Sequence, residues 1–149
     1  MTEFSYLVIS DIHLGHPRNK TQEIIANLDA FFDDYTARSQ FVHVKIIFIA
    51  GDLFDSLLDL ASVDIHDIQL WLFRLMDFCS RYNIKLRILE GTQSHDWKQS
   101  RIAETVFELI KRPLDFRYID TVHIELIQDM GIHVLYVPDD WNPSTEETF

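Results

Sequence analysis

Glycine and proline are scarce in this chain, with four of each among 149 residues. No repeat, low-complexity tract or linker rich in Gly, Ser or Pro interrupts the sequence, so we expect a single domain over residues 1–149. Cysteine occurs once, at Cys79, which excludes an internal disulfide framework and fits a reducing compartment. We therefore expect a cytoplasmic protein.

Long hydrophobic runs are also missing. No apolar run approaches the roughly 20 residues that a membrane-spanning helix needs. The N-terminal sequence "MTEFSYLVISDIHLG" lacks the basic flank and the small-residue cleavage site of a signal peptide. Apolar residues nevertheless make up 47% of the chain, which is enough for a real core. These features predict a globular protein with no membrane partner.

Basic residues are few, with 13 Lys and Arg against 24 Asp and Glu and a formal charge of −11. Non-specific binding to nucleic acid depends on Lys and Arg that neutralise phosphates, so this composition opposes it. A divalent metal ion can supply the missing positive charge at a phosphate-handling site. The acidity therefore indicates a protein that either needs a cation or does not handle phosphate.

Short apolar runs alternate with longer segments of helical periodicity. Strands are predicted over residues 4–10, 41–50 and 84–90, and helices over residues 21–39, 64–82 and 101–112. Two further strand-like runs, "TVHIELI" and "IHVLYVP", flank "QDMG", which has the composition of a hairpin turn. The pattern predicts a layered α/β domain with a largely parallel sheet flanked by helices. In such sheets ligands bind beyond the C-terminal ends of the strands.

Acidic and imidazole side chains follow each of the first three predicted strands. They are Asp11 and His13, then Asp52 and Asp55, then His95 and Asp96. Carboxylates combined with imidazoles suit Mn, Fe or Zn better than Ca or Mg. Each motif alone is typical of an ordinary turn or a solvated loop. All three in order, each after an apolar run, favour a metal site.

The spacing within these motifs supports that interpretation. Asp11 and His13 are two residues apart, so in an extended segment they point the same way and can bind one ion. Gly51 allows the backbone to turn sharply, which places Asp52 where one carboxylate could bridge two ions.

The motifs "DIHLG", "GDLFD" and "GTQSHD" resemble those of the calcineurin-like metallophosphoesterases. The pattern of that family is D-x-H, G-D-x-x-D and G-N-H-[DE], followed by two later histidine motifs. The resemblance covers residues 4–96. The leucine and glycine after His13 and the phenylalanine inside "GDLFD" look most like the branch of DNA-repair exonucleases related to bacterial and phage recombination nucleases.

The resemblance implies a role for each motif. Asp11 and His13 would bind the first metal ion, and Asp52 would bridge it to a second. His95 would protonate the leaving-group oxygen, and Asp96 would orient its imidazole. The cofactors would be two divalent ions, Mn in the first place with Fe, Zn or Mg as alternatives, which clamp the phosphate and activate a bridging water. By the same resemblance, Asp55 would hold the loop or an imidazole.

Two departures from the family pattern concern the second ion. The third motif is two residues longer and lacks the asparagine that ligates this ion. Ser94 stands before the histidine in its place, and Gln93 is an alternative amide ligand, so we expect a weak second site. The later histidine motifs are missing, and we interpret His123 and His133 as strand side chains rather than ligands.

These observations predict a metal-dependent phosphoesterase, a nuclease or exonuclease that hydrolyses DNA by a two-metal mechanism. Two alternatives stay open: a phosphatase or phosphodiesterase acting on small substrates, and a catalytically incomplete fragment that serves as a binding or regulatory module.

Ser144 and Glu147 have the spacing of a capping box, but the sequence stops two residues later, so we expect a truncated chain. A fold cut there would expose apolar surface that favours a partner subunit or a homodimer.

Overall fold

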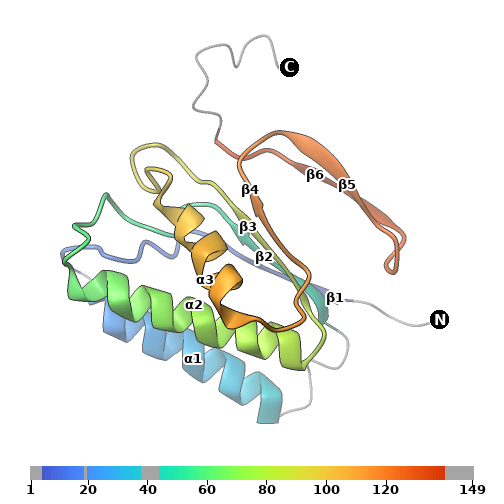
Figure 1. Cartoon of the computed structure of the whole chain (residues 1–149), viewed down its shortest axis with the longest axis horizontal. Coiled ribbons are helices and arrows are strands. Elements are labelled where there is room, and N and C mark those ends of the chain that lie inside the picture. The colour runs from blue at the N-terminus through green and yellow to red at the C-terminus, as the bar shows by residue number, and fades with distance from the viewer. Residues whose placement is uncertain (1–4, 19, 38–43, 140–149) are drawn as a thin grey trace.

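The computed structural model describes residues 5–18, 20–37 and 44–139 (Figure 1). The elements are β1 (Ser5–Ile9), α1 (Thr21–Ala37), β2 (Val44–Ala50), α2 (Val63–Arg81), β3 (Lys85–Leu89), η2 (Gln99–Arg101), α3 (Ile102–Ile110), β4 (Phe116–Ile119), β5 (His123–Ile127) and β6 (Ile132–Tyr136). Within these residues no helix is both long and apolar enough to cross a membrane. The predicted capping box at Ser144 and Glu147 lies outside the described residues.

Four strands form a parallel sheet in the order β1–β2–β3–β4, and β5 and β6 form a separate antiparallel hairpin. Right-handed crossovers between strands that follow one another in this order put every connecting helix on the same face. Figure 1 shows α1, α2 and α3 on one side of the sheet and the hairpin on the other. The predicted α/β class with a largely parallel sheet is confirmed, with helices covering one face.

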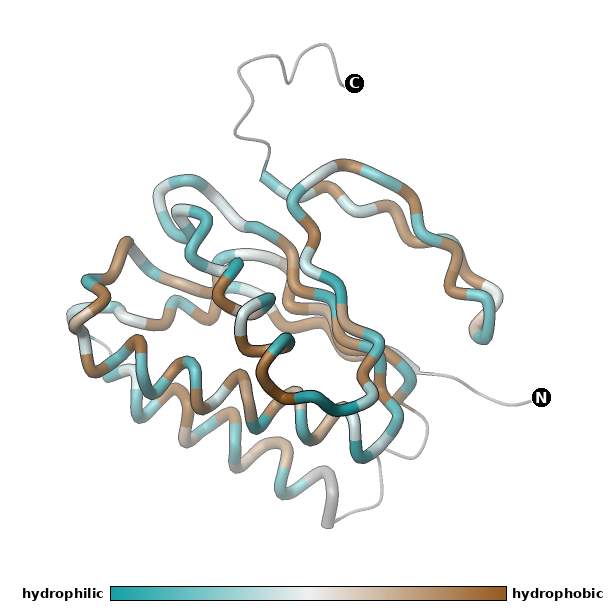
Figure 2. The backbone as a smooth tube through the Cα atoms, viewed as in Figure 1, coloured by the Kyte–Doolittle hydropathy of each residue, from teal (hydrophilic) through white to brown (hydrophobic). Residues whose placement is uncertain are grey.

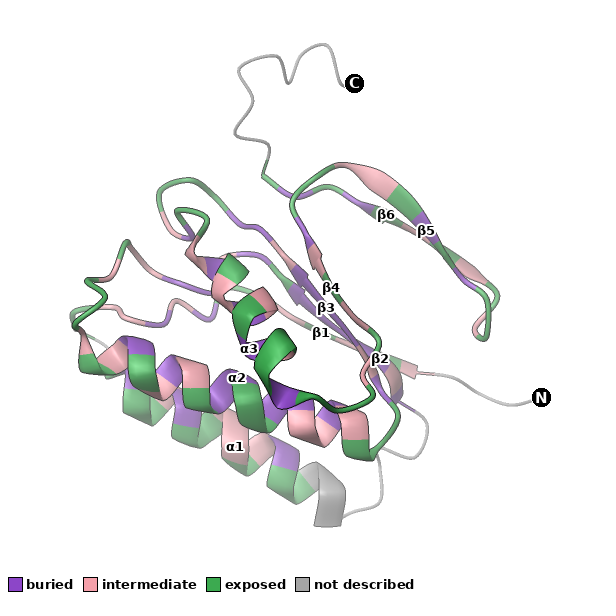
Figure 3. Cartoon of the chain, in the orientation of Figure 1, coloured by how far each residue is buried: buried purple, intermediate pink, exposed green. Residues whose placement is uncertain are grey.

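The central strand β2 is buried on both faces. Ile47 and Ile49 pack into the core beneath the helices, whereas Ile46 and Phe48 pack into a smaller core beneath the hairpin. A strand covered on both sides has apolar residues at nearly every position, which explains the continuous run in the sequence. Figures 2 and 3 show this hydrophobic, buried band through the middle of the sheet.

The strand β4 is not among the predicted elements. Its four residues, "FRYI", pair with β3 from Leu86↔Phe116 to Leu89↔Ile119. The segment is short and includes the exposed, charged Arg117, so its apolar pattern is too weak to be recognised alone. By contrast, the predicted hairpin is confirmed, and its turn ends at Gly131, where φ is +65°.

A buried ion pair fastens the hairpin to the sheet. The Arg87 side chain on β3 is fully buried and donates from Nε and Nη2 to the two carboxylate oxygens of Glu125, at 3.0 and 2.8 Å. The Tyr136 hydroxyl donates to the same carboxylate at 2.7 Å. Burial alone would raise the pKa of Glu125, but these hydrogen bonds and the nearby guanidinium charges outweigh it and lower the pKa to about 2.

Candidate metal centre

The loops that follow β1 and β2 run side by side beyond the sheet. The His13 amide donates to the Asp52 carbonyl at 3.1 Å, and the Asp55 amide donates to the Leu14 carbonyl at 2.9 Å. Leu14 and Phe54 are fully buried and form a parallel bridge between the two loops. The apolar residues between the polar ones therefore anchor both loops and hold their acidic and imidazole side chains together.

The backbone is strained at three of the predicted ligands. Asp11, His13 and Asp52 have φ values of 53°, 53° and 51°, in the left-handed region. This conformation costs a residue other than glycine roughly 1–2 kcal/mol. Such strain concentrates at functional sites, where the surrounding structure holds it in place.

The first group of side chains consists of Asp11, His13 and Asp52. One ligand atom from each lies within 4.8 Å of the others. His13 Nε2 is 3.7 Å from Asp11 Oδ1. The structure thus brings together three of the four residues that the sequence predicts as metal ligands, and Ser94 is not among them.

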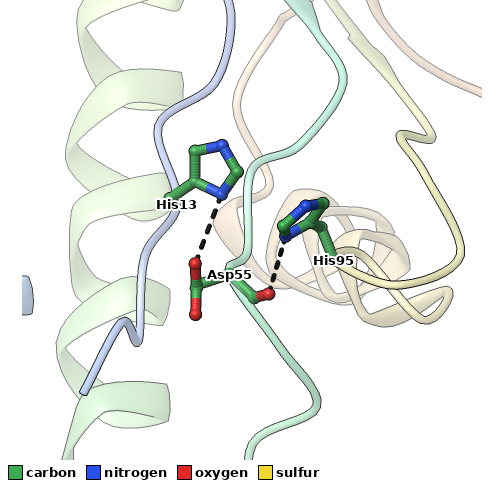
Figure 4. A group of neighbouring side chains, drawn as sticks. All are labelled: His13, Asp55 and His95. Atoms are coloured by element: carbon green, nitrogen blue, oxygen red, sulfur yellow. Dashed lines mark hydrogen bonds and ion pairs between the residues drawn. The ribbon is translucent and has the colours of Figure 1, made fainter.

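A second group shares His13 and adds Asp55 and His95, again with one ligand atom from each within 4.8 Å (Figure 4). His13 Nδ1 is 3.4 Å from Asp55 Oδ1, and His95 Nδ1 is 2.8 Å from the main-chain oxygen of Asp55. The two imidazole rings meet edge to face, with centroids 4.6 Å apart. The prediction that Asp55 holds an imidazole agrees with this geometry, and Asp55 in fact lies beside two.

Asp96 does not contact the His95 imidazole. It is fully buried, its Oδ1 accepts from the Phe54 amide at 2.9 Å, and its Oδ2 accepts from the Gly91 amide at 2.6 Å. The predicted orienting contact is therefore wrong: Oδ1 ties the loop after β3 to the loop after β2, and Oδ2 closes the loop after β3 on itself. Burial raises the pKa of Asp96 in spite of these hydrogen bonds.

Thr92 contacts Asp52 and is absent from the predicted site. Its amide and its hydroxyl donate to Asp52 Oδ1 at 2.8 and 3.0 Å. The exposed Ser94 lies one step further away, with its hydroxyl 3.4 Å from that of Thr92. The position of Thr92 in the sequence could have indicated this contact, because Thr92 directly follows Gly91, as the asparagine follows the glycine in the G-N-H pattern. Ser94 as a metal ligand stays a prediction.

Gly91 is required by this packing. A Cβ at position 91 would overlap the amide nitrogen and Oδ1 of Asp52 and would lie 2.7 Å from Asp96 Oδ2. The glycine therefore lets the two loops approach closely enough for Thr92 to reach Asp52.

Buried Glu90 holds the other end of the same loop. Its carboxylate accepts from the Lys98 amide at 2.7 Å and from the Ser100 hydroxyl at 2.5 Å, and the Tyr118 hydroxyl also donates to it. Burial raises the pKa of Glu90 against the effect of these hydrogen bonds. Its position directly after an apolar strand gave no sign of this role, since the partners come from later in the chain.

A cleft of about 520 Å³ opens at the ends of the strands. Its lining includes Asp11, Asp52 and Thr92 from the strand-end loops and residues 137–139 from the segment that leaves the hairpin. The Asp139 amide donates to the Glu90 carbonyl at 3.2 Å, and its carboxylate accepts from the Gln93 amide at 3.0 Å. This contact uses the main chain of Gln93, and its role as an amide ligand stays a prediction.

The later histidines lie away from this cleft. His123 is on β5, where Nδ1 lies 3.0 Å from the Thr121 carbonyl and the ring packs 5.2 Å from Tyr136. His133 is exposed on β6. Their interpretation as strand side chains is confirmed.

The donor set fits a divalent metal ion. His13 Nδ1 is buried and has no hydrogen-bond partner among the described residues, and it faces Asp55 Oδ1. A proton on Nδ1 would be directed at that carboxylate and would leave the Nε2 lone pair for an ion held with Asp11 and Asp52. Carboxylate–histidine–metal arrangements of this kind are common in metal sites. One imidazole and two carboxylates suit ions that accept both oxygen and nitrogen.

Comparison with models of known protein families finds no match, and no curated protein matches the sequence. The resemblance to the metallophosphoesterases therefore depends on the three motifs and on the geometry in which they meet.

Proposed function

We propose that this chain is a metal-dependent phosphoesterase domain that hydrolyses phosphodiester bonds, with DNA as its substrate. One observation carries the proposal: Asp11, His13 and Asp52 converge from two adjacent loops on strained backbones, and Asp11 and Asp52 line the strand-end cleft. Strained backbones and converging acidic groups reduce the stability of the fold, and a bound cation would offset this cost.

The first ion would be held by Asp11, His13 and Asp52. When bound, a divalent ion supplies charge that binds phosphate and activates a water as the nucleophile. Asp52 Oδ1 already accepts two hydrogen bonds from Thr92, so Oδ2 would be the oxygen more available to an ion. Thr92 therefore fixes the orientation of the carboxylate that the resemblance places between two ions.

His95 would transfer the proton to the leaving group. The Asp55 carbonyl can only accept a hydrogen bond, so the proton of the neutral imidazole resides on Nδ1. Nε2 is then the nitrogen that exchanges a proton with substrate, as a general acid does. The Asp55 main chain would thus take the orienting role that the resemblance assigns to Asp96.

The choice of DNA is supported by the side residues of "DIHLG" and "GDLFD". With 24 acidic residues in the chain, binding of a polyanion depends on the metal ions for positive charge. A phosphatase or cyclic phosphodiesterase would use the same chemistry on a small substrate, so the two alternatives are separated by substrate assays.

A second candidate function is a module that binds one ion without turnover. The described residues offer three donors to the first ion, but the loop beside Asp52 presents the hydroxyls of Thr92 and Ser94 where the family has an amide. Neutral hydroxyls are poor ligands, which favours a weak second site. Such a module would bind Mn²⁺ through Asp52 and hydrolyse nothing.

The test is calorimetric Mn²⁺ titration of the wild type, of Asp52→Asn and of the control Asp33→Asn, whose carboxylate lies on α1. The same proteins are assayed with single-stranded DNA, duplex DNA, bis-p-nitrophenyl phosphate and p-nitrophenyl phosphate. We expect binding and diester cleavage in the wild type and the control, and neither in Asp52→Asn. Binding without cleavage supports the one-ion module, and no binding in the wild type overturns the metal centre.

A further inference from the structure

His13 belongs to both groups of potential ligands, and its two nitrogens face different carboxylates. Nε2 lies 3.7 Å from Asp11 Oδ1, and Nδ1 lies 3.4 Å from Asp55 Oδ1. A neutral imidazole has one N–H and one lone pair, so it ligates a metal ion through one nitrogen at a time. The two groups therefore cannot both use His13 unless the ring loses its remaining proton.

In each tautomer of His13, one nitrogen is available to an ion in one group, and the other donates a hydrogen bond to a carboxylate of the other group. With the proton on Nδ1, the N–H faces the Asp55 carboxylate and Nε2 can join Asp11 and Asp52 around an ion. With the proton on Nε2, the N–H faces Asp11 and Nδ1 can join Asp55 and His95. The carboxylate that does not ligate the ion accepts the hydrogen bond in either case, an arrangement typical of metal-binding histidines.

The second group is the more enclosed and the richer in nitrogen. The side chains of His13 and Asp55 are 28% and 18% exposed, against 68% for Asp11. Nδ1 of His13 is buried without a hydrogen-bond partner among the described residues. One nitrogen of His95 lies within 4.8 Å of the other ligand atoms of this group, and the contact between Nδ1 and the Asp55 carbonyl fixes the ring. Two imidazoles, one carboxylate and an open fourth position are a common catalytic or regulatory ligand set for Zn²⁺.

We propose that His13, Asp55 and His95 form a second cation site, selective for Zn²⁺ and mutually exclusive with the site at Asp11 and Asp52. Mn²⁺ favours the group with more carboxylate oxygen, and Zn²⁺ favours the group with two imidazoles. Zn²⁺ in the second site removes His13 from the first and occupies His95. The ion therefore displaces Mn²⁺ without touching Asp11 or Asp52, and the site does not depend on hydrolytic activity.

The experiment measures binding of each ion alone and in competition, on the full chain. His95→Gln removes a ligand from the second site only, and the matched variant Asp11→Asn removes one from the first only. We expect His95→Gln to weaken Zn²⁺ binding about 10-fold or more and leave Mn²⁺ binding unchanged, and Asp11→Asn to do the reverse. In the wild type, Zn²⁺ should release bound Mn²⁺, seen as the electron paramagnetic resonance signal of the free ion.

A measurement on the wild type removes dependence on how the variants fold. X-ray absorption at the zinc edge counts imidazole ligands, and the second site gives two where the first group gives one. One imidazole, Zn²⁺ affinity unaffected by His95→Gln, or simultaneous binding of Zn²⁺ and Mn²⁺ would each overturn the proposal. Cleavage of DNA with no zinc effect would leave the proposed function standing, and zinc bound by two imidazoles with no cleavage would leave only this site.

Discussion

Two groups of polar side chains, one within the sheet around Arg87 and one in the loops beyond the strand ends, are organised in opposite ways. Around Arg87, all three guanidinium nitrogens donate hydrogen bonds, to Glu125, to Asp115 or to main-chain oxygens. At the strand ends, His13 Nδ1 has no such partner among the described residues, and the backbone is strained at the potential ligands.

The contrast separates polar groups that stabilise the fold from polar groups for which we propose a ligand. Buried polar atoms in folded proteins are almost always paired, so an unpaired one calls for an explanation. The Arg87 network needs none beyond fastening the hairpin. The strand-end groups combine a buried nitrogen without a hydrogen bond among the described residues, left-handed φ values and an adjacent cleft, and on these features we base the proposed metal centre.

The largest effect is expected from breaking the paired group. Arg87→Met leaves the Glu125 carboxylate buried beside an apolar side chain, and removal of one partner from a buried pair costs about 3–5 kcal/mol. Urea unfolding measures the loss. The control is Arg117→Met, because Arg117 is half exposed and its nitrogen is 3.3 Å from Glu125, and exposed pairs contribute less than about 1 kcal/mol. Equal losses in the two variants would remove the distinction.

A smaller effect is expected where the loops meet at the strand ends. Gly91→Ala places a methyl group against Asp52 and Asp96, and overpacking of this kind costs about 1–3 kcal/mol. Because Thr92 would be moved off Asp52, Mn²⁺ affinity should fall as well. Gly131→Ala is the control: the turn position has a positive φ but nothing within 4 Å, so its strain should leave Mn²⁺ binding intact.

The Arg87–Glu125 pair should also determine how the unfolding free energy changes at acidic pH. The pKa of Glu125 is about 2 in the folded protein and near its ordinary value of 4.5 in the unfolded chain. Its contribution is therefore complete above pH 4.5 and is lost as the pH falls towards 2. Between these values Glu125→Gln should flatten the decline in unfolding free energy by at most about 1.4 kcal/mol per pH unit. Urea titrations of both proteins across this range test it, and parallel profiles would contradict it.

The smallest effect on stability is expected at the first group of ligands, and its sign should be opposite. Asp11→Gly relieves a left-handed backbone and removes a mostly exposed carboxylate, so unfolding free energy should stay level or rise by about 1 kcal/mol. Mn²⁺ affinity should fall in the same protein. Thermal unfolding and Mn²⁺ titration on one sample measure both, and a clear loss of stability would place Asp11 with the structural groups.

The parts of the molecule that the sequence predicts are those encoded locally. The apolar runs around β1, β2 and β3 indicated the sheet, and the motifs after them placed Asp11, His13 and Asp52 at one edge. The parts that it did not predict depend on partners distant along the chain. Nothing near Asp96 indicates that its carboxylate binds the Phe54 and Gly91 amides, and β4 is recognised only by its pairing with β3.

The wall of the cleft was beyond local patterns for the same reason. The segment 137–139 reaches the strand ends because Arg87 holds the hairpin that precedes it. The sequence also did not predict that His13 lies in two groups of potential ligands. A motif assigns the histidine to one group, and the second depends on the loops that bring Asp55 and His95 beside it.

Polar contacts attach the hairpin and the segment after it at three positions along β3. Lys85 Nζ lies 2.9 Å from Asp129 Oδ2 at the hairpin turn, Arg87 pairs with Glu125 within the strand, and the Asp139 amide donates to the Glu90 carbonyl just beyond the strand. Contacts at several positions along one strand resist rotation of the hairpin better than a single contact would. The segment that lines the cleft is then held in place before a ligand binds, so binding should cost little conformational entropy there.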